Sequence, residues 1–260
     1  MARLVAGANS SGLFFDFDGV LGPIQVDPAT VWPTPGVVDA LSGLVARVKR
    51  VAIVSARPIA FLRPRFDGIS GLVLYGHYGL QTMTPDGTEV TDPAAVDWMP
   101  VIRDLADRAR AELPDDVLIE QKPLSVTLHY RAAPHRQGLV RDWGDEQVRR
   151  LGVAAQSGRM IVEIRPPVER DKGHVIERET GDLETAWYFG DDVSDLRAFQ
   201  ALSEREAESP GFVGVRVAVT NEETGQPLAE AADIRIETTA AVPRFLGQLL
   251  GALERGVTTT

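Results

Sequence analysis

The pattern of apolar and polar residues predicts alternating strands and helices over the first part of the chain. The apolar, aromatic run GLFFDF at residues 12–17 leads into the turn-forming sequence DGV, which is typical of a buried strand that enters a loop. Apolar residues recur at helical spacing from 37 to 48, and the β-branched run RVAIVS follows at 50–55. These segments predict a βαβ unit, and GLVLYG at 71–76 predicts a third strand.

The pattern changes in the middle of the chain. TPDGTEVTDP at residues 84–93 is rich in turn residues and suits a domain boundary. The sequence beyond it predicts a small inserted α/β unit, because strands and helices alternate there with a different spacing. The predicted elements are a helix at 94–113, a strand at 124–131, a helix at 135–152 and a strand at 159–167.

The first pattern resumes after the insertion. Strands that alternate with helices of this length favour a parallel sheet with helices on both faces. We therefore predict a doubly wound α/β core formed by residues 1–90 and 168–260, with a smaller α/β domain inserted at 91–167. The elements predicted in the last part are helices at 173–179, 194–206 and 241–253, and strands at 185–190 and 212–219.

Composition narrows the possible partners. The chain has 260 residues, of which 44% are hydrophobic and 25% charged, as in an ordinary globular protein. Its formal net charge of -10 argues against binding to nucleic acid or to an anionic membrane. The absence of cysteine excludes disulfides and thiolate chemistry. The first residues, MARLVAGANSSG, fit neither a signal peptide nor a membrane span, so we expect a cytoplasmic protein.

Reactive side chains follow several of the predicted strands. In open α/β sheets, ligands bind beyond the carboxyl ends of the strands, so these positions are candidates for a functional site. The side chains are Asp16 and Asp18 after the first strand, Ser55 after the second, Lys172 before a later helix, and Asp191, Asp192 and Asp195 after the next strand.

These residue types together indicate phosphoryl transfer. Carboxylates that converge on one place repel one another unless a cation holds them, and an all-oxygen set suits Mg²⁺. Lys172 and the hydroxyl of Ser55 supply donors for an anion. Each residue also has an ordinary structural interpretation, since Asp-Gly forms turns and Ser55 or Asp195 can stabilise a helix start. The functional interpretation is favoured because all of them occur together, in order.

Four short motifs at these positions resemble those of the haloacid dehalogenase superfamily of phosphohydrolases. They are DFDGV at 16–20, VSAR at 54–57, DKG at 171–173 and GDDVSD at 190–195. The longer stretches IEQKPLSVTLHYR and VEIRPPVERDKG resemble trehalose-6-phosphate phosphatases, and the likeness runs from about residue 13 to 250. The resemblance implies a haloacid dehalogenase-like core, a cap domain that recognises the sugar of the substrate, and Mg²⁺-dependent hydrolysis of trehalose 6-phosphate.

The resemblance also implies roles for individual residues. Asp16 would be the nucleophile that forms an aspartyl-phosphate, Asp18 the general acid and base, and Ser55 and Lys172 the groups that hold the phosphoryl oxygens. The implied Mg²⁺ ligands are Asp16, the backbone carbonyl of Asp18, and Asp191, with Asp192 or Asp195 reached directly or through water. The implied substrate-binding residues are Arg57, His77, Glu120, Lys122 and Glu163.

Several positions depart from the family pattern and keep alternatives open. Ala56 stands where the second motif usually has glycine, and Tyr78 and Gln81 stand where the pattern has histidine and glutamate. A phosphatase or phosphomutase for another sugar phosphate or sugar-like metabolite is therefore an alternative. A phosphoaspartate signalling module and a binding-only relative are further alternatives, although the former would need no cap. We expect a monomer or a weak homo-oligomer.

Overall fold

The structure is a computed structural model, and it describes residues 2–158, 160–221 and 224–257. The chain divides into two compact units. The core unit comprises Met1–Val90 and Arg170–Thr260, and the inserted unit comprises Thr91–Glu169. Among the described residues, no helix is both long and apolar enough to cross a membrane.

The core unit is built on a mostly parallel sheet. Within the described ranges this sheet has eight strands in the order β12-β11-β10-β1-β2-β3-β4-β5, and the run from β12 to β3 is parallel. The prediction of a doubly wound α/β core is therefore confirmed. The strands are β1 Ser11–Phe15, β2 Arg50–Val54, β3 Leu72–Gly76, β4 Gln81–Met83, β5 Glu89–Thr91, β10 Thr185–Gly190, β11 Val213–Val219 and β12 Ile234–Ile236.

The central strand β1 is buried on both faces. Leu13 and Phe15 belong to one hydrophobic cluster, and Phe14 belongs to a second cluster on the opposite face. Phe15 also stacks on Phe189 of the neighbouring β10, with ring centroids 4.5 Å apart. Burial on both faces explains why this strand has a continuous apolar sequence and not an alternating one.

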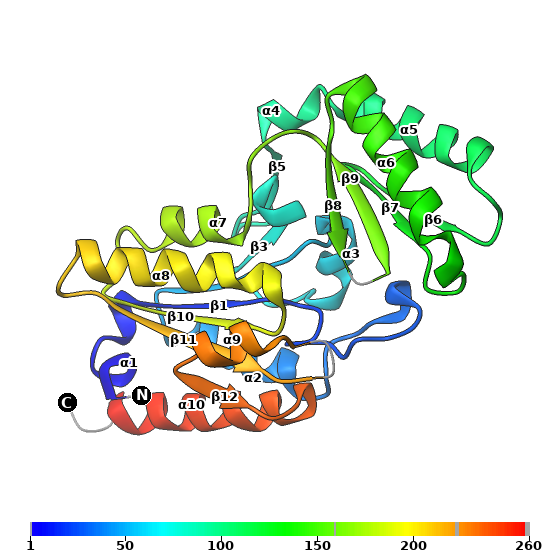
Figure 1. Cartoon of the computed structure of the whole chain (residues 1–260). Coiled ribbons are helices and arrows are strands. Elements are labelled where there is room, and N and C mark those ends of the chain that lie inside the picture. The colour runs from blue at the N-terminus through cyan, green and yellow to red at the C-terminus, as the bar shows by residue number, and fades with distance from the viewer. Residues whose placement is uncertain (1, 159, 222–223, 258–260) are drawn as a thin grey trace. The chain divides into compact units, whose positions relative to one another are not determined.

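Helices cover both faces of the core sheet (Figure 1). The cluster that contains Leu13 and Phe15 also contains residues of α1, α2, α3 and α10, and the cluster that contains Phe14 contains residues of α7, α8 and α9. Both clusters consist of hydrophobic side chains, so the sheet is held between two layers of helices. The helices are α1 Ala2–Ala6, α2 Val37–Val45, α3 Ile59–Leu62, α7 Lys172–Glu179, α8 Leu196–Glu208, α9 Gln226–Ala231 and α10 Val242–Val257.

The inserted unit has its own sheet and core. Its antiparallel strands lie in the order β6-β7-β9-β8. Alternate residues of β7 and β9 join a hydrophobic cluster with α5 and α6, so one face of the sheet packs on helices. The elements are α4 Pro93–Val96, α5 Met99–Glu112, β6 Leu118–Lys122, β7 Ser125–His129, α6 Gln137–Leu151, β8 Ala154–Gly158 and β9 Ile161–Arg165.

Some local predictions were wrong. The segment 84–93, predicted to consist of turns, contains the short strand β5, and the unpredicted strand β4 lies directly before it. The single helix predicted at 94–113 is divided into α4 and α5, because Pro100 lies in the first turn of α5, where a proline is tolerated, and a proline inside a longer helix would break it. Strand β8 was not predicted, since its sequence AAQSG is polar and mostly exposed.

Candidate active site

A buried ionic cluster lies at the carboxyl ends of β1 and β10. The Nζ of Lys172 donates to Asp16 Oδ2 and to Asp195 Oδ1, both at 2.7 Å. One carboxylate oxygen from each of Asp16, Asp191 and Asp195 lies within 4.8 Å of the others, and all three residues are buried. The structure therefore brings together four of the residues that the sequence indicated, namely Asp16, Lys172, Asp191 and Asp195.

The charges of this cluster do not balance. Burial raises the pKa of Asp16 and of Asp191 well above the ordinary aspartate value, and the neighbouring carboxylates raise each pKa further. Burial opposes the charge of Lys172, but the carboxylates of Asp16 and Asp195 outweigh it and raise the lysine pKa. Three carboxylates face one ammonium group, so the all-oxygen cluster could hold a divalent metal ion.

Asp195 differs from its neighbours because its carboxylate is already saturated with hydrogen bonds. Oδ1 accepts from Lys172 and from the hydroxyl of Tyr188, each at 2.7 Å. Oδ2 accepts from the backbone N–H groups of Asp191 and Asp192 at 2.9 and 3.1 Å. A carboxylate accepts about four hydrogen bonds. Asp195 thus joins the lysine to the loop, and Tyr188, a strand residue without a motif, escaped the sequence analysis.

Asp191 is oriented by a residue from another loop. The Nδ2 of Asn221, after β11, donates to Asp191 Oδ2 at 2.8 Å. The amide of Asn221 is fixed in turn, since its Oδ1 accepts from the N–H of Thr224 at 3.1 Å. The sequence analysis missed Asn221, and the signal that could have found it is its position at the carboxyl end of the strand beside β10.

The other acidic residue of the GDDVSD loop, Asp192, bonds locally. Its Oδ1 accepts from the backbone N–H and the hydroxyl of Ser194, at 2.8 and 2.6 Å. Burial opposes the charge of Asp192, but Lys172 and the bonds from Ser194 lower its pKa overall. The side chain therefore caps the turn Val193–Asp195 in its ionised form.

The carboxylate of Asp18 pairs with Arg57. The Nε and one terminal nitrogen of Arg57 each donate to Asp18 at 2.8 Å, in a bidentate contact. The guanidinium of Arg57 also lies 4.4 Å from the ring centroid of Phe61. The structure thus links Arg57, for which the resemblance implied substrate binding, with the residue implied to be the acid and base.

Ser55 and His77 lie beside this pair. Ser55 follows β2, and its Oγ accepts from the backbone N–H of Arg57 at 3.1 Å, so the hydroxyl proton is not used in that bond. His77 follows β3, is buried, and its backbone N–H donates to the carbonyl of Arg57 at 3.1 Å. The loops after β2 and β3 are therefore bonded to each other.

The inserted unit carries a separate polar network on its sheet. Lys122 Nζ lies 3.4 Å from Glu163 Oε1 and 3.9 Å from Glu120 Oε2. The hydroxyl of Ser125 donates to Glu163 at 2.9 Å, and His129 Nε2 lies 2.9 Å from Glu120. Because these residues alternate with the apolar ones, the network occupies the sheet face opposite the helices. The structure therefore groups Glu120, Lys122 and Glu163.

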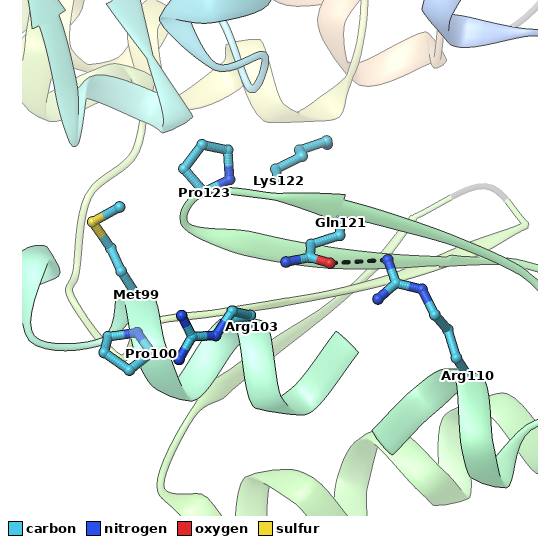
Figure 2. Close-up of a pocket in the computed structure, with 7 residues that line it drawn as sticks. All are labelled: Met99, Pro100, Arg103, Arg110, Gln121, Lys122 and Pro123. Atoms are coloured by element: carbon cyan, nitrogen blue, oxygen red, sulfur yellow. Dashed lines mark hydrogen bonds between the residues drawn. The ribbon is translucent and has the colours of Figure 1, made fainter. Parts of the chain in front are cut away.

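The inserted unit also has an open cavity of about 650 Å³ (Figure 2). Figure 2 shows Gln121 and Lys122 on opposite sides of β6, with Arg110 bonded to Gln121 at 2.9 Å. Arg110 also pairs with Asp107, and Arg103 with Asp104. The cations at the cavity are already paired. The lining residues are Met99, Pro100, Arg103, Arg110, Gln121, Lys122 and Pro123.

Comparison with protein families decides the affiliation of the chain. A model described as trehalose-phosphatase matches residues 14–232. The chain belongs to the trehalose-phosphatase family. This confirms the resemblance inferred from the motifs.

Relatives within the family are moderately similar. The chain is 34% identical over 252 residues to a trehalose-phosphate phosphatase of Mycobacterium marinum, which covers 93% of this chain. It is 32% identical over 253 residues to one of Mycobacterium tuberculosis H37Rv, again over 93% of this chain. The chain spans only 62% of the length of each of these relatives.

Solved structures share the fold. A trehalose-6-phosphate phosphatase related protein has a TM-score of 0.78 at 23% identity, over 96% of this chain and 100% of its own. The C-terminal domain of the C. albicans trehalose-6-phosphate phosphatase has a TM-score of 0.77 at 23% identity, over 96% and 94%. A haloacid dehalogenase-like hydrolase from Bacteroides thetaiotaomicron has a TM-score of 0.62 at 16% identity, over 95% and 99%. The expected haloacid dehalogenase-like fold is thereby confirmed.

Proposed function

We propose that this chain is a Mg²⁺-dependent phosphatase that hydrolyses trehalose 6-phosphate to trehalose and phosphate. The observation that carries the proposal is the buried cluster of Asp16, Lys172, Asp191 and Asp195 at the carboxyl edge of the sheet. This cluster combines a carboxylate nucleophile with a cationic donor, in a chain of the trehalose-phosphatase family.

The proposed reaction has two displacements at phosphorus. The Asp16 carboxylate attacks phosphorus, the bond from phosphorus to the sugar oxygen breaks, and that oxygen takes a proton from Asp18. Water then attacks the aspartyl-phosphate and transfers a proton to Asp18, which releases phosphate and restores Asp16. Lys172, held 2.7 Å from Asp16, and the hydroxyl of Ser55 would bind the phosphoryl oxygens.

The residues that would hold Mg²⁺ are Asp16, Asp191 and the backbone carbonyl of Asp18. Bound there, the ion would neutralise charge on the phosphoryl oxygens. The saturated carboxylate of Asp195 supports a positioning role for that residue, in place of direct ligation. The bonds of Asp192 to Ser194 support the same conclusion for Asp192. Asn221 would orient Asp191, as residues around metal ligands commonly do.

The polar network of the inserted unit supports recognition of a sugar. Glu120, Lys122 and Glu163 offer both donors and acceptors on one sheet face, and Glu163 is only 6% exposed. A site built from such groups rejects analogues that lack a matching hydroxyl, because its own polar groups would be left unpaired. We therefore assign substrate recognition to the inserted unit.

Phosphate release from a panel of sugar phosphates tests this function. Trehalose 6-phosphate should be hydrolysed much faster than glucose 6-phosphate, mannose 6-phosphate and sucrose 6-phosphate, and a chelator should abolish the activity. Comparable slow rates on all of them would contradict the substrate assignment and favour another sugar phosphate. The appearance of an isomerised sugar phosphate would identify a phosphomutase instead.

Replacement of the nucleophile tests the chemistry. Asp16→Asn removes the attacking charge but keeps the shape of the side chain, so turnover should fall by at least about 10³-fold. Circular dichroism should show an unchanged fold. Substantial residual turnover in a folded Asp16→Asn protein would exclude Asp16 as the nucleophile.

A further inference from the structure

The turn after β3 has an unusual backbone. His77, Tyr78 and Gly79 follow one another with φ values of 49°, 59° and 93°. This left-handed region is common for glycine but uncommon for residues with a Cβ, and it persists only where surrounding contacts hold it. Two such residues in succession, beside the candidate site, therefore require a structural reason.

The left-handed turn directs its backbone donors onto the loop that carries Ser55. The N–H of His77 donates to the carbonyl of Arg57 at 3.1 Å, and the N–H of Tyr78 donates to the carbonyl of Ser55 at 3.0 Å. On the other side, the N–H of Ser55 donates to the carbonyl of Tyr75 at 2.9 Å. The loop from Ser55 to Arg57 is thus bonded to residues before and within the turn.

A side chain makes the next contact. Gln81, the first residue of β4, accepts through Oε1 from the N–H of Ile59 at 3.1 Å. Ile59 begins α3, the helix that directly follows the Ser55 loop. The approach is close, because a Cβ at Gly76 would lie 2.8 Å from the carbonyl oxygen of Arg57 and 2.9 Å from the nitrogen of Ile59.

We propose that Gln81 is a positioning residue for the loop that carries Ser55 and Arg57. It acts with the left-handed turn, and the position requires an acceptor oxygen and not a charge. Glutamine therefore serves where the family pattern has glutamate, since both side chains place an Oε1 at the same distance from the backbone. This inference rests on the proposed function, because the role of Ser55 toward a phosphoryl group belongs to that proposal.

The acceptor requirement is tested with a matched pair of variants. Gln81→Met keeps the length of the side chain but removes the acceptor, so kcat/KM for trehalose 6-phosphate should fall by about 10- to 100-fold. Gln81→Glu keeps the acceptor and should stay within about threefold of the wild type. Gln200→Met is the control for the same chemical change, because Gln200 is exposed on α8 and bonds only to Glu204 in the described contacts. This control should leave kcat/KM unchanged.

A double-mutant cycle tests whether Gln81 acts through the loop. If it does, Gln81→Met should lower kcat/KM much less in a Ser55→Ala or Arg57→Met background than in the wild type. Thermal melting checks that each variant is folded. Should Gln81→Met fail to melt cooperatively, Gln81→Asn, which is one methylene shorter, takes its place with the same expected loss.

Two results would overturn the inference. One is a loss in Gln81→Glu as large as that in Gln81→Met, and the other is a full additive loss in both loop backgrounds. Either result leaves the proposed function intact as long as the wild type hydrolyses trehalose 6-phosphate and Ser55→Ala impairs it. Failure of the wild type itself would instead count against the proposed function.

Discussion

Asp191 and Asp195 carry the same side chain in one loop but have different surroundings. Asp195 accepts hydrogen bonds on both oxygens from four donors. Among the described contacts, the Asp191 carboxylate accepts one, from Asn221, and neighbouring carboxylates raise its pKa. A carboxylate surrounded by hydrogen-bond donors stabilises the fold, whereas the repulsion between neighbouring carboxylates is relieved when a cation binds to them. The two residues should therefore respond differently to the same substitution.

Asp195→Asn should lower the free energy of unfolding by about 3 kcal/mol, because it leaves Lys172 and the backbone donors without their buried charged partner. Asp191→Asn removes a charge from a repulsive cluster and should leave the stability of the metal-free protein nearly unchanged, while it weakens Mg²⁺ binding by at least about tenfold. Urea unfolding and isothermal titration calorimetry measure the two effects. Equal loss of stability in both variants would contradict this division of roles.

Two features of position 19 favour glycine, the left-handed backbone and the close approach of the Asp191 side chain. Gly19 has a φ of +77°, and a Cβ there would lie 2.0 Å from Asp191 Oδ2. Gly19→Ala should therefore displace Asp191 and weaken Mg²⁺ binding by about tenfold or more, as measured by calorimetry. Gly87→Ala is the control, because Gly87 has a φ of +84° but no atom within 4 Å of a Cβ. It shares the backbone strain but should leave Mg²⁺ binding unchanged.

At the residue level, the sequence predicted those side chains whose position follows from strand ends. Asp16 and Asp191 could be expected to meet, because the carboxyl ends of parallel strands lie at one edge. Lys172, the first residue of α7, was predicted from its place at a helix start. The contact of Asn221 with Asp191 could not be predicted, since a single asparagine in a loop belongs to no periodic pattern. The pairing of Arg57 with Asp18 likewise depends on how two loops approach each other.

At the level of elements, apolar continuity was the reliable signal. Strands β1 and β10 are buried on both faces and could be identified from their apolar runs. Strand β8 could not, because pairing with β9 stabilises it despite its polar, exposed sequence. Strands β4 and β5 are short and lie next to turn residues, which masks their pattern.

An ion pair links the start of β2 with the connection between α7 and β10. Asp182 lies 2.8 Å from Lys49 and 3.0 Å from Arg50, and hydrogen bonds from these two residues lower its pKa to about 2. A lowered folded-state pKa contributes stability that is present above about pH 4 and is lost as the pH falls toward 2. Because the pair is exposed, its contribution at pH 7 should be about 0.5 kcal/mol.

Asp182→Asn tests this linkage. The variant should be less stable than the wild type at pH 7, and the difference should shrink when unfolding in urea is repeated between pH 4 and pH 2. Glu254→Gln removes one partner of another exposed ion pair, the one with Arg47, and its effect on stability is compared with that of Asp182→Asn. A difference between wild type and Asp182→Asn that does not change with pH would contradict the assigned cause.

At the level of the whole molecule, the inserted unit has the features of an independent domain. Its hydrophobic cluster contains only its own residues, and its sheet is complete within one continuous segment. We expect residues 91–169, produced alone, to unfold in a single cooperative transition. Tryptophan fluorescence can follow it, because Trp98 and Trp143 both pack against that cluster. A gradual, non-cooperative change would show that this segment depends on the core unit.

The fold class could be predicted because alternating apolar strands and helices restrict a chain to few arrangements. The order of the strands could not be predicted, since β1 lies between β2 and β10, and β10 comes from the part of the sequence after the insertion. The cytoplasmic location, the oligomeric state and the sugar recognised stay predictions, because they depend on partners and not on the local pattern.

The position of Gln81 at the start of β4 has a mechanical consequence. Its backbone pairs with Gly76 of β3, and β4 pairs with β5, whose last residue, Thr91, is the first residue of the inserted unit. A pull on the chain at Thr91 therefore loads the hydrogen bonds between these short strands before it reaches Gln81. We therefore expect Ser55 to keep its position under such a pull for as long as β4 and β5 stay paired.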